Sequence, residues 1–179
     1  MTAIAGLIDS GKVWIGGDSA GVSGLSMQTR SDPKVFRIGE FIFGYTSSFR
    51  MGQLLEHEFA PPTPYEGEHG MPYMVRRFIP AVRELMKNGG YQENRSGQEI
   101  GGTFLVGYRG NLYEVGDDYQ VARVIQPYHA CGCGRDFALG SLHATEQFEL
   151  PAKERIIMAL QAAEEFSAGV RGPYTVICE

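Results

Sequence analysis

Residues 1–18 read MTAIAGLIDSGKVWIGGD, and the fold follows from this stretch. It holds two short apolar runs, 3–8 and 13–17, on either side of the turn sequence at 9–12. Apolar runs of this length around a turn containing Asp, Ser and Gly predict a β-hairpin. The first strand of that hairpin would begin directly after Thr2.

Thr2 carries the chemistry that this hairpin would position. If Met1 is removed, Thr2 has a free α-amine beside its hydroxyl. An α-amine has a pKa of roughly 8 in an unperturbed chain, so it can act as general base for the hydroxyl of its own residue. Such a residue is nucleophile and base together, and the chain then needs no catalytic histidine.

Asp18 and Lys34 follow Thr2 at two predicted strand ends. Asp18 closes the second strand of the hairpin, and Lys34 opens the next strand. A lysine ammonium near Thr2 would favour the deprotonated forms of its amine and hydroxyl, and Asp18 would compensate that charge. Taken singly, Asp18 is typical of a turn and Lys34 of a solvated strand end. Together with Thr2 they make a set suited to acyl transfer.

Outward from the hairpin, runs of strands alternate with pairs of helices. Further strands are expected at 34–38, 41–45, 103–108, 111–115, 121–130 and 174–178, and helices at 49–59, 72–86, 135–146 and from 151 onward. Pro80 predicts a kink or break in the second helix. Loops are expected at 19–33, at 60–70 and in the polar stretch that ends at Gly101.

This element order favours an α+β fold over alternating βαβ units. Two antiparallel sheets packed face to face, with helix pairs outside, would satisfy it. The chain shows no internal repeat or linker, so we expect one domain over residues 1–179.

Composition excludes several classes of protein. The formal charge of −5 and the absence of a basic stripe argue against a nucleic-acid partner. No charged leader precedes an apolar segment and no apolar run approaches the length of a membrane span, so we expect a cytoplasmic protein with no membrane partner. The cysteines Cys131, Cys133 and Cys178 complete no zinc pattern and are expected to be reduced thiols.

The sequence resembles the proteasome-type β subunits, and most closely the bacterial HslV-type peptidase ring, a family of N-terminal-nucleophile (Ntn) hydrolases. The segments that carry the resemblance are Thr2–Gly6, Ile15–Ser19, Lys34–Val35, Phe43–Ser48, Ala130–Gly134 and Ala163–Thr175. The resemblance covers most of the chain. It implies a four-layer αββα sandwich and a threonine endopeptidase enclosed in a self-compartmentalising ring.

The resemblance also implies a role for each site residue. Thr2 would attack a peptide carbonyl, Lys34 would lower the pKa of Thr2, and Asp18 would hold Lys34. A backbone N–H near Ser47 would stabilise the oxyanion. Cys133 would support the Thr2 amine from the turn that precedes a helix.

Several positions depart from the family pattern. Cys133 replaces a serine, and a thiol is a weaker hydrogen-bond partner than a hydroxyl. Ser47-Ser48 replaces a Gly-Gly pair, which would strain a turn that needs a positive φ. Near the C-terminus, Glu165 stands for the family's acid, and Ala168 falls where a serine is expected.

The resemblance implies no required cofactor. Gly169, Gly172 and Thr175 match positions at which HslV-type proteins bind a monovalent cation such as sodium through backbone carbonyls. An ordinary helix end followed by a strand is the alternative interpretation of this segment.

The expected partners are further copies of the chain in a homo-oligomeric ring, a polypeptide substrate and an ATP-driven AAA+ unfoldase. Two other functions remain open from the sequence. One is an Ntn amidase that acts on a small molecule. The other is a catalytically silent structural ring, because a retained Met1 would block the Thr2 amine.

Overall fold

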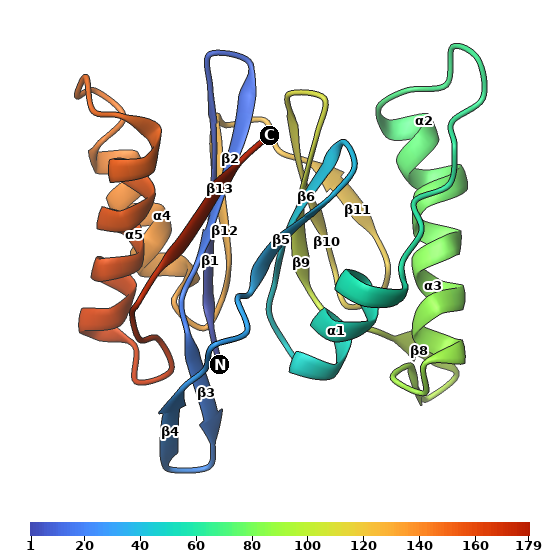
Figure 1. Ribbon diagram of the computed structural model, residues 1–179, viewed down its shortest axis with the longest axis horizontal. Coiled ribbons are helices and arrows are strands. Elements are labelled where there is room, and N and C mark those ends of the chain that lie inside the picture. Colours follow the sequence, from blue (N-terminus) through green and yellow to red (C-terminus); the bar gives the residue numbers. More distant parts are fainter.

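Two antiparallel sheets form the inner layers of the computed structural model, which describes residues 1–179 (Figure 1). The first sheet has the strand order β12 (Tyr128–Gly132), β1 (Ala3–Asp9), β2 (Lys12–Gly17) and β13 (Thr175–Cys178). The second has the order β11 (Val121–Arg123), β10 (Asn111–Val115), β9 (Phe104–Tyr108), β6 (Phe41–Tyr45) and β5 (Val35–Ile38).

Helices cover the outer face of each sheet (Figure 1). The first sheet packs against α4 (Arg135–Ala144) and α5 (Ala152–Phe166). The second packs against α1 (Phe49–Glu58), α2 (Met71–Tyr73), the π-helical η1 (Met74–Phe78) and α3 (Ile79–Asn88). The expected αββα order of layers is therefore confirmed.

Three apolar clusters fill the three interfaces between these four layers. One packs aromatic residues such as Phe43 and Phe78 between the second sheet and its helices. One packs small and branched residues such as Ala5 and Ile156 between the first sheet and α5. The third, which includes Ile4 and Ile42, lies between the sheets. Each sheet is thus buried on both faces over much of its area.

Glycines in the strands permit this close packing. A Cβ built on Gly16 would lie 2.3 Å from the Ile156 side chain, so α5 rests directly on the backbone of β2. A Cβ on Gly44 would lie 2.5 Å from the side chain of Ile4 in the opposite sheet. Larger residues at either position would force the layers apart.

The predicted hairpins are confirmed. In β1 and β2, Ile4 is opposite Gly17 and Asp9 is opposite Lys12, which places the start of β1 beside the end of β2. β5 pairs with β6, and β9 with β10, in the same antiparallel manner.

Two expectations about irregular segments were wrong. The stretch 19–33 contains a hairpin of β3 (Ala20–Ser23) and β4 (Ser26–Thr29), and the polar stretch before Gly101 contains β7 (Glu93–Arg95) and β8 (Gln98–Ile100). Both hairpins are short and largely exposed, so they lack the apolar alternation that marks a strand in sequence. The strand region expected at 121–130 contains β11 and the start of β12, which belong to different sheets.

Pro80 accounts for the irregular second helix. A proline has no N–H and its ring collides with the carbonyl four residues earlier. The chain widens to a π-helical turn immediately before it, in which the Ile79 N–H bonds to the Met74 carbonyl. A regular α-helix resumes with Pro80 in its first turn.

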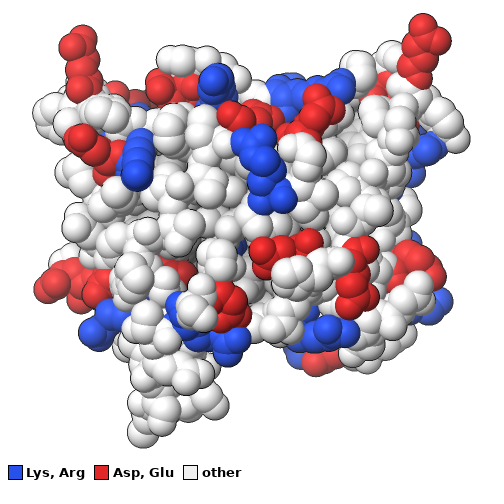
Figure 2. Space-filling model, viewed as in Figure 1, with Lys and Arg blue, Asp and Glu red and all other residues white.

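Charged side chains of both signs are scattered over the face in Figure 2, with no continuous basic surface on that face. The β3–β4 hairpin projects from the body as an uncharged extension (Figures 1 and 2). None of the helices has the length and apolar content needed to cross a bilayer.

Candidate active site

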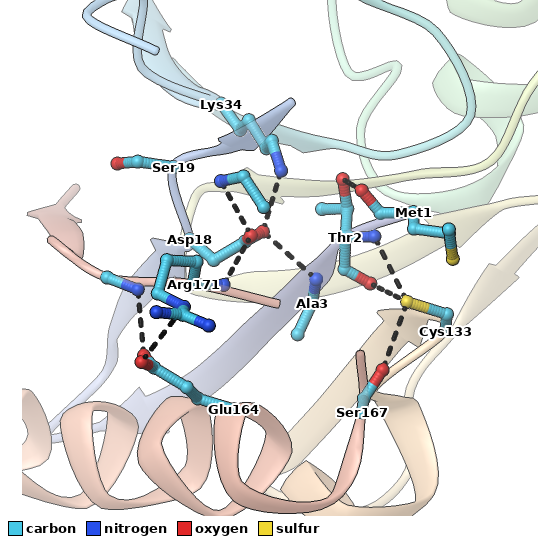
Figure 3. Close-up of polar contacts among 12 residues, drawn as sticks. Met1, Thr2, Ala3, Asp18, Ser19, Lys34, Cys133, Glu164, Ser167 and Arg171 are labelled. Carbon is cyan, nitrogen blue, oxygen red and sulfur yellow. Dashed lines mark hydrogen bonds and ion pairs between the residues drawn. The ribbon is translucent and has the colours of Figure 1, made fainter. Parts of the chain in front are cut away.

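The strand order of the first sheet assembles the site. β1 lies between β12 and β2. Thr2 precedes β1, Asp18 follows β2 and Cys133 follows β12, so antiparallel pairing brings all three to one end of the sheet. Lys34 reaches the same end from the start of β5 in the second sheet. Figure 3 shows Asp18 and Lys34 on one side of Thr2 and Cys133 on the other.

Asp18 is buried and fully hydrogen-bonded. Oδ1 accepts from Lys34 Nζ at 2.8 Å and from the Ala3 N–H at 3.1 Å. Oδ2 accepts from the N–H groups of Ala20 at 2.9 Å and Arg171 at 3.2 Å. Four donors hold the carboxylate in one orientation, which in turn fixes the Lys34 ammonium.

Lys34 is as buried as its partner, with 1% of its side chain exposed. Burial lowers the pKa of Lys34, and the charge and hydrogen bond of Asp18 oppose that shift. The side chain donates to Asp18 and to no other group of the chain. It also lines a cavity of about 60 Å³ together with Thr2, Tyr45 and Ser47. A buried cation is therefore presented to the space beside Thr2.

Cys133 contacts the backbone of Thr2 on the other side. The Thr2 N–H donates to Cys133 Sγ at 3.2 Å, and Sγ lies 3.4 Å from the Thr2 carbonyl oxygen. Sγ is also 3.3 Å from Ser167 Oγ, beyond the end of α5. The preceding Gly132 has a φ of 94°, and a Cβ there would lie 2.2 Å from the Thr2 carbonyl oxygen. Glycine at 132 is thus required for this approach.

Met1 engages both the hydroxyl and the nitrogen of Thr2. Thr2 Oγ1 donates to the Met1 carbonyl oxygen at 2.5 Å, and the Thr2 nitrogen is an amide while Met1 is attached. Thr2 itself is 5% exposed. Removal of Met1 would convert that nitrogen to an amine and free the hydroxyl.

Ser47 forms the turn between β6 and α1. Its φ of 61° is in the left-handed region, as expected for a position where the family carries glycine. Its N–H donates to no group of the chain, and the residue lines the same small cavity as Thr2. Ser48 caps α1 by accepting from the Arg50 N–H at 3.1 Å.

The assignment of Glu165 as the family's acid stays a prediction, but the contacts at the end of α5 are made by its neighbour. Glu165 is exposed. Its neighbour Glu164 accepts from the Gly172 N–H at 2.8 Å and from the Tyr174 hydroxyl, and it lies 3.5 Å from Arg171. The Tyr174 hydroxyl and the Gly172 N–H hold the pKa of Glu164 below its ordinary value, against the effect of burial.

A serine lies one position before Ala168. Ser167 caps the last turn of α5 through its N–H, and its hydroxyl reaches Cys133, whereas Ala168 is exposed. The contact of Ser167 with Cys133 depends on where α5 ends, and in the sequence Ser167 lies just beyond the apolar periodicity.

Two other contributors to the site were missed. The Arg171 N–H binds Asp18, and Ser19 donates its hydroxyl to the Pro173 carbonyl at 2.6 Å and its N–H to the Arg171 carbonyl at 2.8 Å. Both act through the backbone of the segment before β13. Backbone contacts of this kind leave no residue-type signature in a sequence.

The expected cation site stays a prediction. Gly169 packs against Met1 and Cys133, the Gly172 N–H is bound by Glu164, and Thr175 opens β13 opposite Gly17. No contact among the described residues gathers the carbonyl groups of these three positions.

No protein-family model and no curated protein matches the chain. Solved structures do. BPH of Thiobacillus denitrificans in complex with epoxomicin superimposes with a TM-score of 0.80 at 20% identity, covering 99% of this chain and 98% of that one. Eukaryotic HslV from Trypanosoma brucei superimposes with a TM-score of 0.68 at 17% identity, covering 99% and 98%. Anbu from Yersinia bercovieri does so with a TM-score of 0.66 at 13% identity, covering 99% and 81%.

These structures share the fold of proteasome-type Ntn-hydrolase subunits. The likeness extends over almost the whole of this chain. The chain therefore has the proteasome-like α+β fold, as the sequence predicted.

Proposed function

We propose that this chain is a threonine-type endopeptidase in which Thr2 becomes the N-terminal nucleophile once Met1 is removed. The observation that carries the proposal is the convergence on Thr2 of three groups from different elements. They are the Asp18–Lys34 pair, the Cys133 thiol and the free N–H of Ser47. The fold shared with HslV and BPH also supports the proposal.

The first step is acylation of Thr2. Oγ1 attacks the carbonyl carbon of a peptide bond, and its proton passes to the free α-amine, which later gives a proton to the leaving amine. Lys34 favours loss of the hydroxyl proton through its positive charge. The Ser47 N–H donates to the oxyanion of the tetrahedral intermediate. Collapse of the tetrahedral intermediate completes this first step: the C–N bond of the substrate breaks, the amine leaves with the proton from the α-amine, and the acyl group remains on Oγ1 as an ester.

The second step releases the enzyme. Water attacks the ester while the α-amine accepts a proton from the water. The bond between the acyl carbon and Oγ1 then breaks, the α-amine gives that proton to Oγ1, and the carboxylic acid leaves. Thr2 returns to its starting state with one peptide bond hydrolysed.

Burial makes the Asp18–Lys34 pair suited to this role. Both side chains are at most 1% exposed, so solvent screens the ammonium little on the side that faces Thr2. Four donors hold Asp18, so the pair does not need to reorganise during the reaction.

We further propose that the chain acts as a homo-oligomeric ring on polypeptide substrates delivered by an AAA+ unfoldase, in the cytoplasm. Exposed aromatic rings support self-association. The ring centroids of Phe137 in α4 and Phe166 in α5 are 5.4 Å apart, and the two residues are 41% and 69% exposed. The three unpaired cysteines are consistent with a reducing compartment. Sedimentation of the purified protein tests the assembly, and a monomer would contradict it.

The intact mass of the protein tests the chemistry. The protein is isolated from its host and measured before and after incubation with epoxomicin. We expect loss of Met1 and one covalent adduct, with no adduct on Thr2→Ala and an unchanged adduct on the remote Thr63→Ala. Cleavage of fluorogenic peptides in preference to small amides separates a peptidase from a small-molecule amidase.

A catalytically silent ring is the second candidate. In this candidate Met1 stays attached, so the Thr2 nitrogen remains an amide and the Thr2 hydroxyl donates to the Met1 carbonyl oxygen. Retained Met1 together with no adduct, in an assembled particle, would support this candidate and overturn the peptidase.

A further inference from the structure

The turn at Ser47 adopts a conformation that serine does not favour. A φ of 61° is costly for residues with a Cβ, and glycine alone adopts it freely. The turn nevertheless has to keep this shape if the Ser47 N–H is to point into the cavity beside Thr2. Something in the chain must therefore offset the missing glycine.

A closed ring of hydrogen bonds surrounds the Ser47 side chain. The Thr103 N–H donates to Ser47 Oγ at 3.1 Å, and Thr46 Oγ1 donates to the Thr103 carbonyl oxygen at 2.8 Å. Ser47 Oγ and Thr46 Oγ1 are 3.3 Å apart. Since the Thr46 hydroxyl hydrogen is given to Thr103, the Ser47 hydroxyl is the donor in this last contact. Each hydroxyl then donates once and accepts once, so no group in the ring competes with another.

Two further features anchor the ring to the second sheet. The Thr46 N–H donates to the same Thr103 carbonyl at 3.0 Å, which continues the pairing of β6 with β9. Gly102 leaves room for the serine, because a Cβ there would lie 3.0 Å from Ser47 Cβ and 2.4 Å from Met51 Sδ. The Ser47 hydroxyl is thus tied to a strand end.

We propose that the Ser47 hydroxyl is a positioning group for the oxyanion-binding N–H of its own residue. By accepting from Thr103 and donating to Thr46, it holds the left-handed turn that glycine would otherwise supply. The inference rests on the proposed function, because a positioning role requires the reaction that it serves. It predicts that the hydroxyl matters for kcat and not for substrate binding.

Two substitutions at Ser47 test this inference against simple packing. Ser47→Ala removes the hydroxyl but keeps the cost of a positive φ, so the turn relaxes and kcat falls by about tenfold. Ser47→Gly removes more of the side chain but also removes that cost, so kcat falls by only about threefold. KM changes by less than about twofold in both variants, since neither substitution alters ground-state binding. The larger truncation therefore has the smaller effect.

Ser96→Ala is the matched control. Ser96 also has a positive φ, of 52°, but lies in the turn between β7 and β8, away from the site. The kcat of Ser96→Ala should equal that of the wild-type protein.

The outcomes separate the two proposals. If the wild-type protein cleaves peptides and Ser47→Ala keeps its kcat, or if Ser47→Gly is impaired at least as much as Ser47→Ala, the positioning role is overturned while the peptidase stands. If the wild-type protein neither cleaves peptides nor forms the Thr2 adduct, the proposed function fails, and the positioning role fails with it.

Discussion

Lys34 Nζ and Asp18 Oδ1 lie 2.8 Å apart in an ion pair that is almost completely shielded from solvent. Asp18 also binds three backbone N–H groups, whereas Lys34 binds Asp18 alone. The two partners therefore depend on each other unequally. Loss of the aspartate leaves the buried Lys34 cation without a partner. Loss of the lysine leaves a carboxylate that still accepts from three backbone N–H groups.

Asp18→Ala should severely destabilise the protein. It leaves the Lys34 charge without a partner and three N–H groups without an acceptor, which corresponds to a loss of about 3–5 kcal/mol in the free energy of unfolding. Urea unfolding measures the change. Asp32→Ala, which breaks the more exposed pair with Arg30, should cost less than about 1 kcal/mol. Similar losses for the two variants would contradict the argument.

Lys34→Met should fold but lose the reaction. Asp18 keeps its three backbone donors, so the site retains its shape. Without the cation, acylation of Thr2 should slow by about 100-fold or more. The rate of adduct formation with epoxomicin, followed by intact mass, provides the measurement. The control is Lys12→Met, which should react at the wild-type rate, because Lys12 is exposed and lies at the start of β2, next to the turn.

Gly132→Ala should disturb the site through the backbone. The new Cβ would meet the Thr2 carbonyl oxygen at 2.2 Å, in a residue whose φ is 94°. We expect a loss of at least about 2 kcal/mol in unfolding free energy and no Thr2 adduct. The comparison variant is Gly140→Ala in α4, where a Cβ meets nothing within 4 Å. It should gain up to about 1 kcal/mol, because alanine is the better helix former.

Cys133→Ser should raise the rate of acylation, since a hydroxyl is a stronger partner than a thiol for the nitrogen of Thr2. Cys133→Ala removes that contact and the one with Ser167, and should lower the rate by about tenfold. Single-turnover kinetics on a fluorogenic peptide would report both changes. Cys178→Ser, in the edge strand β13, serves as control. Equal rates for the serine and alanine variants would exclude this role of the thiol.

Glu114 and His129 should make the stability depend on pH. The pair, 3.0 Å apart, joins β10 of the second sheet to β12 of the first. The hydrogen bond from His129 lowers the pKa of Glu114 from its ordinary value of 4.5, against the effect of burial. The contribution of this carboxylate is complete above that ordinary value and is lost as the pH falls through the lower folded-state pKa.

The test is unfolding at several pH values. Wild-type protein should lose about 1 kcal/mol more than Glu114→Gln on going from pH 5 to pH 3. Glu40→Gln, which removes the exposed partner of Arg109, is the matched control. Parallel pH profiles for wild type and Glu114→Gln would show that the pair contributes nothing.

The sequence by itself determined the parts of this protein that depend on local pattern. Apolar runs broken by turn residues predicted the hairpin that carries Thr2, and helical periodicity located α1, α4 and α5. The order of these elements also predicted the four layers. The β1–β2 hairpin placed Asp18 near Thr2, because antiparallel neighbours return the chain to the same edge of a sheet. Lys34 reaches Thr2 from the second sheet, so the packing of the two sheets places it there.

Only the tertiary structure decided the details that depend on backbone atoms far apart in the chain. The Arg171 N–H on Asp18 and the Thr103 N–H on the Ser47 hydroxyl come from segments with no residue pattern of their own. The contact of Ser167, not a residue at 168, with Cys133 depends on where α5 ends. A sequence specifies side chains and local propensity, whereas the partner of a backbone donor is set by the packing of whole layers.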